Sequence, residues 1–246
     1  MLLHSLPKKP AVIAIVEVKY KNSRTFELAE LNLNGYVLYS NKFDVNSRGV
    51  IIYVDSQLES KLISLDDSYK ESVFIKVKAN KTSWTTIGCI YRSPNSNPEN
   101  DNKLFELIDI NSRNCKNENL LITGDFNFND INWETWSSAY TSGDKFLDSL
   151  RNNFLYQHVN YPTRARGTDT PHILDLVLTN EPFINNVEYF SPLGKSDHSV
   201  LLITTTLLNC IKTNRVRKNF NKGDYDGLRN FLTVDWDRTL SREGTD

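Results

Sequence analysis

Short apolar runs of strand length dominate this chain and constrain its fold more than any other feature. Several are apolar at successive positions, as in sheets that are buried on both faces. They cover residues 11–16, 36–39, 49–54, 72–78, 84–91, 120–123, 173–178, 187–190 and 199–208. Because strands outnumber helices and do not alternate strictly with them, we predict an α/β (α+β) fold. Its expected form is a four-layered sandwich of two mainly antiparallel sheets flanked by helices.

Two stretches carry apolar side chains at helical spacing. Residues 99–114 place Leu104, Phe105 and Ile108 on one stripe, and residues 142–154 form a second stripe. Thr141 or Ser142 is expected to cap the second helix.

The length of 246 residues allows one large domain, or one domain with a tail. We predict a domain over residues 1–208 and a basic linker with a short helix over residues 209–246. No apolar stretch approaches the ~18 residues of a membrane span, and the N-terminus lacks a signal-peptide pattern. An intracellular protein without a membrane partner is therefore expected, and no obligate protein partner is evident.

The net charge of −1 does not by itself indicate nucleic-acid binding. Residues 212–222 are the exception, because they contain five basic residues and no acidic one. These residues are Lys212, Arg215, Arg217, Lys218 and Lys222. The three cysteines have no paired spacing, which indicates neither a disulfide framework nor a zinc cluster.

Two polar motifs lie at the ends of apolar strands, where α/β enzymes often keep their chemistry. The first is Gly124-Asp125-Phe126-Asn127, after the strand 120–123. In an extended chain Asp125 and Asn127 point the same way while Phe126 packs inward. The acid can orient water or hold a metal, and the amide can bind a phosphate oxygen. The alternative is a simple turn, since these residue types favour turns.

The second motif is Ser196-Asp197-His198, before the last strand. Asp175 lies within an apolar run, where burying a carboxylate is costly unless a partner meets it. An imidazolium is a suitable partner, because a carboxylate can orient a histidine through one ring nitrogen. The alternative for Asp175 is an exposed strand end.

Two further strands end in polar groups. Glu17 closes the run 11–16, and a glutamate there is a good ligand for Mg²⁺. Tyr91 and Arg92 end the run 84–91 and offer a phenol and a guanidinium to a phosphate. Packing between the strand and its loop is the alternative for this pair.

These motifs, in this order over about residues 8–208, resemble the endonuclease/exonuclease/phosphatase superfamily, the fold of apurinic endonucleases and deoxyribonuclease I. The resemblance is strongest to the endonuclease domain of non-LTR (LINE-type) retrotransposons. The residues that carry it are Glu17, 49–54, 91–94, 121–127, 162–164, 174–180 and 196–198.

The resemblance implies a role for each matching residue. Glu17 would be the principal ligand of Mg²⁺ or Mn²⁺, with Asp197 nearby. Asp125 would align or deprotonate the attacking water, Asn127 would hold the scissile phosphate, and Tyr91 would contact the phosphate or leaving group. Asp175 would orient His198, which with Asp197 would stabilise the transition state. Thr163 and Ser196 match accessory positions, and the expected DNA contacts are Arg92, Arg164, Lys212, Arg215 and Arg217.

The chain departs from the family pattern at its start. The family begins with an asparagine-bearing strand and a helix, whereas Met1 lies only ten residues before the run 11–16. Val16-Glu17-Val18-Lys19 also stands where the family often has Thr-Glu-Thr-Trp. We therefore expect the first strand to be missing and the domain to be N-terminally truncated.

The function expected from the resemblance is Mg²⁺-dependent nicking of DNA by a retrotransposon endonuclease domain, normally fused to a reverse transcriptase and nuclear. Two alternatives stay open. One is a phosphatase or phosphodiesterase of the same fold acting on a small or lipid phosphate. The other is a non-catalytic, degenerate remnant.

Overall fold

The computed structural model describes residues 6, 8–18, 28–42, 47–64, 68–78, 83–165, 167, 169–207 and 224–233. The chain divides into two units, Met1–Ile211 and Lys212–Asp246. No helix in these ranges is long and apolar enough to cross a membrane.

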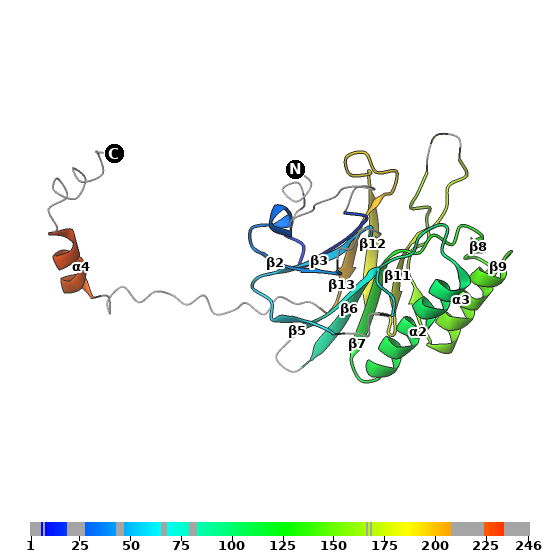
Figure 1. The fold of residues 1–246 in the computed structure, drawn as a ribbon, viewed down its shortest axis with the longest axis horizontal. Helices are drawn as coiled ribbons and strands as arrows, with labels where there is room; N and C mark the ends of the chain where they lie inside the picture. The colour runs from blue at the N-terminus through cyan, green and yellow to red at the C-terminus, as the bar shows by residue number, and fades with distance from the viewer. Residues whose placement is uncertain are drawn as a thin grey trace. The chain divides into compact units, whose positions relative to one another are not determined.

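A six-stranded sheet forms the centre of the first unit (Figure 1). Its strand order is β10 (Tyr156–Gln157), β11 (Asp175–Thr179), β7 (Asn119–Asp125), β6 (Trp84–Tyr91), β5 (Ser72–Lys78) and β4 (Ser60–Leu62). The β6–β7 pair is parallel, and the other pairs are antiparallel.

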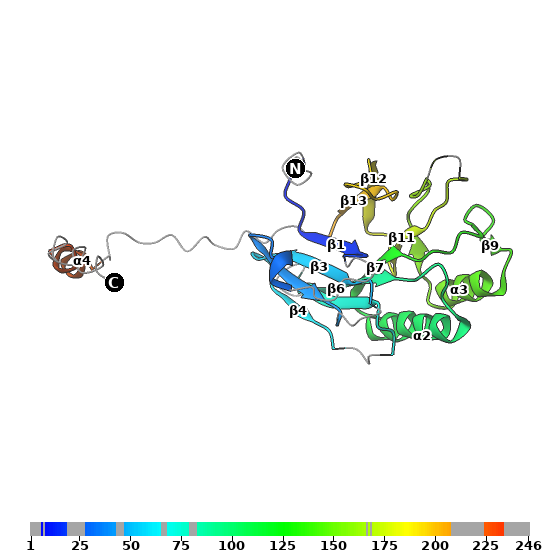
Figure 2. The ribbon, with the colours of Figure 1, turned by 45° about the horizontal axis from the view of Figure 1, so that its top comes forward.

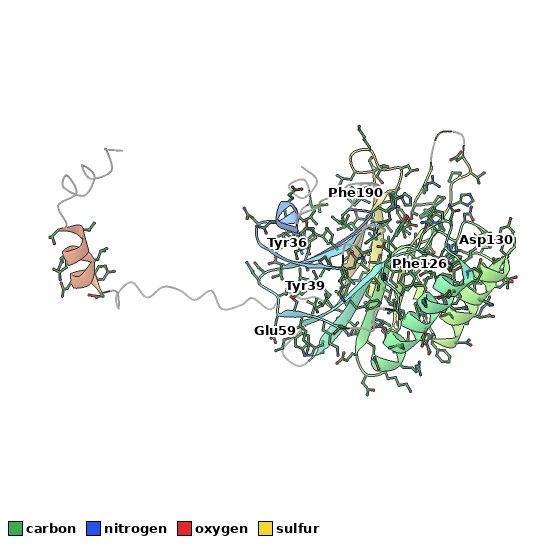
Figure 3. All side chains as sticks on the ribbon, viewed as in Figure 1. Tyr36, Tyr39, Glu59, Phe126, Asp130 and Phe190 are labelled. Carbon is green, nitrogen blue, oxygen red and sulfur yellow. The ribbon has the colours of Figure 1, made fainter. Side chains whose placement is uncertain are left out.

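Two helices lie side by side over one face of this sheet (Figure 1). They are α2 (Pro98–Asn114) and α3 (Thr141–Asn152), and their buried stripes include Leu104, Ile108, Phe146 and Leu150. Phe126, labelled in Figure 3, directly follows β7 and is fully buried in the same core. Its ring centroid lies 5.4 Å from that of Phe146. Phe126 therefore packs inward, as the sequence predicts.

A second set of strands covers the opposite face (Figure 2). A three-stranded antiparallel sheet has the order β1 (Val12–Val16), β3 (Val50–Asp55) and β2 (Tyr36–Ser40). An antiparallel hairpin of β12 (Ile184–Phe190) and β13 (Val200–Thr205) contributes Ile184 to the same core. This core joins Val50, Ile52 and Val54 of β3 to alternate residues of β5 and β6.

The predicted fold class of two packed, mainly antiparallel sheets with flanking helices is confirmed. On the outer side of β3 lies the 3-10 turn η1 (Leu28–Leu31). Tyr53, whose neighbours in β3 face the core, donates its hydroxyl to Leu31 O at 2.6 Å. Within the same ranges β1 pairs only with β3, and the expected missing strand stays a prediction.

The local differences from the sequence predictions have simple causes. Helix α3 begins at Thr141, and its N-cap is Tyr140 without a side-chain cap bond, so the predicted cap at Thr141 or Ser142 is wrong. Strands β4, β8 (Ile131–Asn132), β9 (Ser137–Ser138) and β10 were not expected, because two or three residues carry no readable periodicity.

The second unit contains helix α4 (Tyr225–Leu232). Tyr225, Leu228 and Leu232, which the sequence predicts on one helical face, are all exposed. The predicted domain boundary at residue 208 stays a prediction.

Candidate active site

Strand register brings three of the predicted site residues abreast. Asp125 of β7 pairs with Tyr91 of β6 on one side and with Asp175 of β11 on the other. Residues paired across neighbouring strands point to the same face of a sheet. Two motifs that are 50 residues apart in sequence therefore converge at the end of the central sheet.

His198 completes this row. Its Nδ1 lies 2.7 Å from Oδ2 of Asp175, and both side chains are largely buried. Because a carboxylate accepts, Nδ1 carries the proton and donates it. The predicted pairing of Asp175 with His198 is present in the structure, while the catalytic role of the pair stays a prediction.

Residues 196 and 197 both approach His198. Ser196 accepts the backbone N–H of His198 on its Oγ at 3.1 Å. Asp197 places Oδ1 at 4.0 Å from Nε2 of His198 and receives Nε of Arg164 on Oδ2 at 2.9 Å. The imidazole thus has one carboxylate hydrogen-bonded at Nδ1 and a second carboxylate 4.0 Å from Nε2.

Thr163 supports this arrangement from below the surface. Its side chain is 1% exposed, and its Oγ1 accepts the backbone N–H groups of Leu174 and Asp175 at 3.1 and 3.0 Å. Its carbonyl accepts the N–H of Ser199 at 2.7 Å. Thr163 therefore ties the start of β11 to the loop that carries His198.

Asn127 contacts Asp125 directly. Its Nδ2 donates to Asp125 Oδ2 at 2.6 Å and to the carbonyl of Arg92 at 2.9 Å, and its backbone N–H donates to Asp125 Oδ1 at 3.2 Å. The backbone turns at Asn127 with a φ of 50°, so the predicted extended geometry is wrong. The two side chains converge through a turn, and both amide protons of Asn127 already have acceptors.

Glu17 follows β1 in the facing sheet and also adopts a positive φ, of 55°. Its Oε1 lies 3.4 Å from a guanidinium nitrogen of Arg48. A hydrogen bond from Tyr91 reaches Glu17, and burial together with this carboxylate raises the pKa of Tyr91. Tyr91 is consequently a protonated, buried donor at the boundary between the two sheets.

The carboxylates and the imidazole shift one another's pKa values. Burial and the neighbouring Asp175 raise the pKa of Asp125 to about 8, with a further contribution from Glu17. Burial lowers the pKa of His198, but the hydrogen bond and charge of Asp175 outweigh it and raise that pKa to about 8. Strongly shifted groups of this kind concentrate at functional sites.

One group of side chains in the described ranges has the geometry to share a metal ion. Ligand atoms of Asp125, Asp175 and His198 all lie within 4.8 Å of one another. The metal ligands expected from the sequence were Glu17 and Asp197, which here contact Arg48 and Arg164 instead. Their predicted metal role stays a prediction.

Comparison with known proteins agrees with this geometry. Residues 85–202 match the profile of the endonuclease-reverse transcriptase family. This match supports the resemblance to the endonuclease/exonuclease/phosphatase superfamily that the sequence motifs indicate. The endonuclease domain of TRAS1, a telomere-specific non-LTR retrotransposon, has a similar fold, with a TM-score of 0.62 at 18% sequence identity. That match covers 81% of this chain and 87% of the TRAS1 domain. A search of curated proteins gave no match.

The superfamily resemblance also predicted DNA contacts, and for one of them the structure requires a correction. Arg92 is 5% exposed, and its guanidinium is bound to Asp101 and to backbone carbonyls. A side chain enclosed in this way cannot reach a DNA backbone. Lys212, Arg215 and Arg217 lie outside the described residues.

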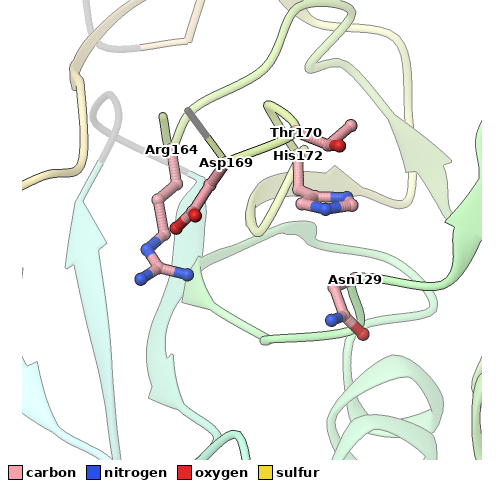
Figure 4. A pocket seen from close by; sticks show the side chains of 5 residues that line it. All are labelled: Asn129, Arg164, Asp169, Thr170 and His172. Carbon is pink, nitrogen blue, oxygen red and sulfur yellow. The ribbon is translucent and has the colours of Figure 1, made fainter. Parts of the chain in front are cut away.

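Arg164 lies at the edge of the site instead. It lines a polar cavity of about 290 Å³ together with Asn129, Asp169, Thr170 and His172 (Figure 4). Because the same guanidinium binds Asp197, this cavity adjoins the His198 side of the site. The predicted DNA contact of Arg164 stays a prediction.

Two site residues escaped the sequence analysis. Arg48 precedes β3 by two residues and contacts Glu17, and Asp101 lies in the first turn of α2 and contacts Arg92. The sequence offers a weak signal for Arg48, which directly precedes the strand motif 49–54. It offers none for Asp101, which looks like an ordinary acid in a first helical turn.

Proposed function

We propose that this chain is the DNA-nicking endonuclease domain of a retrotransposon, which hydrolyses one phosphodiester bond with a divalent metal ion and leaves a 3′ hydroxyl. The observation that carries the proposal is the row Asp125–Asp175–His198 at the mouth of the central sheet. The match of residues 85–202 to the endonuclease-reverse transcriptase family supports the choice of substrate.

Asp125 is the group that aligns and deprotonates the attacking water. A general base has to be positioned before its pKa matters, and Asp125 lies in the row with Asp175 and His198. The water oxygen bonds to phosphorus as Asp125 takes its proton, the bond to the 3′ oxygen breaks, and that oxygen takes a proton from solvent to become the 3′ hydroxyl. Asn127 fixes the Asp125 carboxylate, and a direct bond from Asn127 to phosphate requires one of its amide protons to leave its present acceptor.

His198 stabilises the charge that develops on the phosphate oxygens. Its pKa of about 8 keeps it an imidazolium near neutral pH, so Nε2 carries a proton toward the Asp197 side. Asp175 holds the ring through Nδ1. A preorganised cation of this kind is worth more in a water-poor site than in bulk solvent.

The donor set fits a hard divalent cation. Asp125 and Asp175 converge, and Glu17 lies near enough to raise the pKa of Asp125, so three carboxylates repel one another. Mg²⁺ prefers such oxygen ligands and keeps several waters. Glu17 is the residue we assign to it, with Asp197 as the second predicted ligand and the Asp125 and Asp175 carboxyl groups adjoining. When bound, the ion supplies Lewis-acid stabilisation of the phosphate.

Nicking of supercoiled plasmid tests the proposal. We expect conversion to the open circle with Mg²⁺ or Mn²⁺, and none with chelator. Asp125→Asn and His198→Ala should keep a cooperative melt and lose at least about a hundredfold in turnover, the low end for positioned acid–base groups. His158→Gln is the matched control, because His158 bonds Thr179 outside the site. Near-parental turnover in either site variant would contradict the assignment.

The same assay separates the two alternatives. Cleavage of a small phosphodiester without plasmid nicking would favour a phosphodiesterase of this fold. A folded chain that cleaves neither substrate with Mg²⁺ or Mn²⁺ would favour a non-catalytic remnant.

A further inference from the structure

Arg92 and Asp101 form a buried ion pair next to the site. Nε and Nη2 of Arg92 donate to the two carboxylate oxygens of Asp101 at 2.7 and 2.9 Å, and both side chains are about 5% exposed or less. Burying two charges costs desolvation free energy that their attraction often only just offsets. The pair is therefore a poor device for stability alone.

The remaining guanidinium nitrogen of Arg92 faces the loop after β7. Nη1 donates to the carbonyls of Phe126 and Asn127 at 3.3 and 3.1 Å, and the guanidinium lies 3.9 Å from the ring centroid of Phe128. The backbone of Arg92 joins the same loop, because its N–H donates to the Asp125 carbonyl at 2.8 Å. Its own carbonyl accepts from Nδ2 of Asn127 at 2.9 Å.

This loop needs such support. Asn127 has a φ of 50°, a left-handed conformation that is uncommon for a residue other than glycine. In this conformation the Asn127 amide reaches Asp125 Oδ2 at 2.6 Å. A rotation of the 126–127 peptide would carry that amide away from the carboxylate.

We propose that the Arg92–Asp101 pair is a positioning device that holds Asn127 in its left-handed turn and so fixes the Asp125 carboxylate. Asp101, in the first turn of α2, fixes the position of the guanidinium. The guanidinium in turn fixes the loop, because Nη1 of Arg92 donates to the carbonyls of Phe126 and Asn127. The expected effect on kcat rests on the proposed endonuclease function. The expected effect on the conformation of Asn127 does not.

The double variant Arg92→Met with Asp101→Leu removes both charges and fills the same space with apolar side chains. Such replacements are often neutral for stability, and a methionine sulfur can pack on the Phe128 ring. We expect the double variant to melt as the parent does and to keep its KM for DNA. Its kcat should fall by about tenfold or more, because small misplacements of reacting groups are costly.

A second readout does not depend on activity. In NMR spectra the side-chain amide signals of Asn127 should shift in the double variant, whereas those of Asn180 should not. Asn180 is a fitting internal reference, since its amide is also bonded to backbone, with Nδ2 at 2.9 Å from the Glu118 carbonyl. Lys76→Gln with Glu118→Gln removes a different ion pair, of 2.6 Å, and should leave kcat and the Asn127 signals unchanged.

Parental kcat and unshifted Asn127 signals in the double variant would overturn the proposal. If the double variant does not fold, Arg92→Lys decides, because lysine cannot bind a carboxylate in two places and also reach both carbonyls. Shifted Asn127 signals in that variant support the proposal, and parental signals overturn it. A parent chain that nicks no DNA would remove the endonuclease function, and the NMR comparison would still decide the positioning role.

Discussion

At the scale of single residues, the site places one histidine among several carboxyl groups. Asp175 and His198 are joined by a 2.7 Å contact, and the pKa of the imidazole rises to about 8. The folded-state pKa therefore lies above the ordinary value of 6.5. The stabilisation from this charge is fully present below pH 6.5 and is lost as the pH rises through about 8.

Asp175→Asn tests this linkage. Removing the carboxylate should lower the pKa of His198 by about 1 unit or more, the size of effect an adjacent opposite charge produces. The melting temperature of the variant should then vary less between pH 6.5 and 8 than that of the parent. An NMR titration of the His198 ring proton gives the pKa directly. An unchanged pKa would mean that Asp175 does not hold the imidazolium.

Glu17→Gln tests the metal assignment at the same scale. Glutamine keeps the size of the side chain and removes the charge that faces Arg48 and Tyr91. We expect half-maximal nicking to need about tenfold more Mg²⁺, a loss typical of disturbed metal surroundings. Arg48 would then lose its ion-pair partner, so the melt of the variant is the control for folding. An unaltered Mg²⁺ requirement would exclude Glu17 as a ligand.

At the scale of elements, the close pairing of β6 and β7 positions Asp125. Gly124 has a φ of 138°, and a Cβ at this position would lie 1.9 Å from the carbonyl oxygen of Ile90 in β6. Only glycine lets the two strands approach at the residue before Asp125. Asn180 secures the other end of β7, because its Oδ1 accepts the N–H of Leu120 at 2.8 Å.

Gly124→Ala should therefore force β7 away from β6 and move Asp125. We expect a loss of at least about 2 kcal/mol in the free energy of unfolding, together with loss of nicking. Gly167→Ala is the matched control, since Gly167 has a φ of 57° and no atom within 4 Å of its added Cβ. Denaturant unfolding of both variants measures the difference. Equal costs would show that the positive φ matters and the contact with Ile90 does not.

The elements also show which parts of the fold and the site the sequence predicts. Runs such as 49–54 and 84–91 became β3 and β6, because continuous apolar residues have few alternatives to a buried strand. The site motifs were recognisable since each lies directly before or after an apolar strand, which is a local property. The predicted DNA contact of Arg92 is wrong because the sequence does not show that this charged side chain is buried. Its partner Asp101 lies in α2, and the sequence does not show that α2 brings Asp101 against Arg92. For Asn127 the sequence left an extended chain and a turn both open, because the contact of the Asn127 carbonyl with Arg92, in the segment after β6, is a tertiary one.

At the scale of the whole molecule, the charge is unevenly distributed. The net charge is −1, yet residues 212–222 hold five basic residues and no acid. DNA affinity from such a segment would come from phosphate contacts and counterion release, which depend on salt but not on base sequence. The site residues, in contrast, all belong to the first unit, Met1–Ile211.

A chain ending at residue 211 should accordingly melt and cleave as the full chain does at saturating DNA, but bind DNA more weakly. Neutral replacements of Lys212, Arg215, Arg217 and Lys218 in the full chain should also weaken DNA binding and leave cleavage unchanged. Removing one cation that pairs with a phosphate lowers the slope of log affinity against log salt by about 0.9 for duplex DNA, so removing four would change it by about 3.6. Fluorescence anisotropy with a labelled duplex across a salt series measures the slope. Replacing acidic residues of α4 such as Asp226 is the control, and an unchanged slope would make the basic segment a solvated linker.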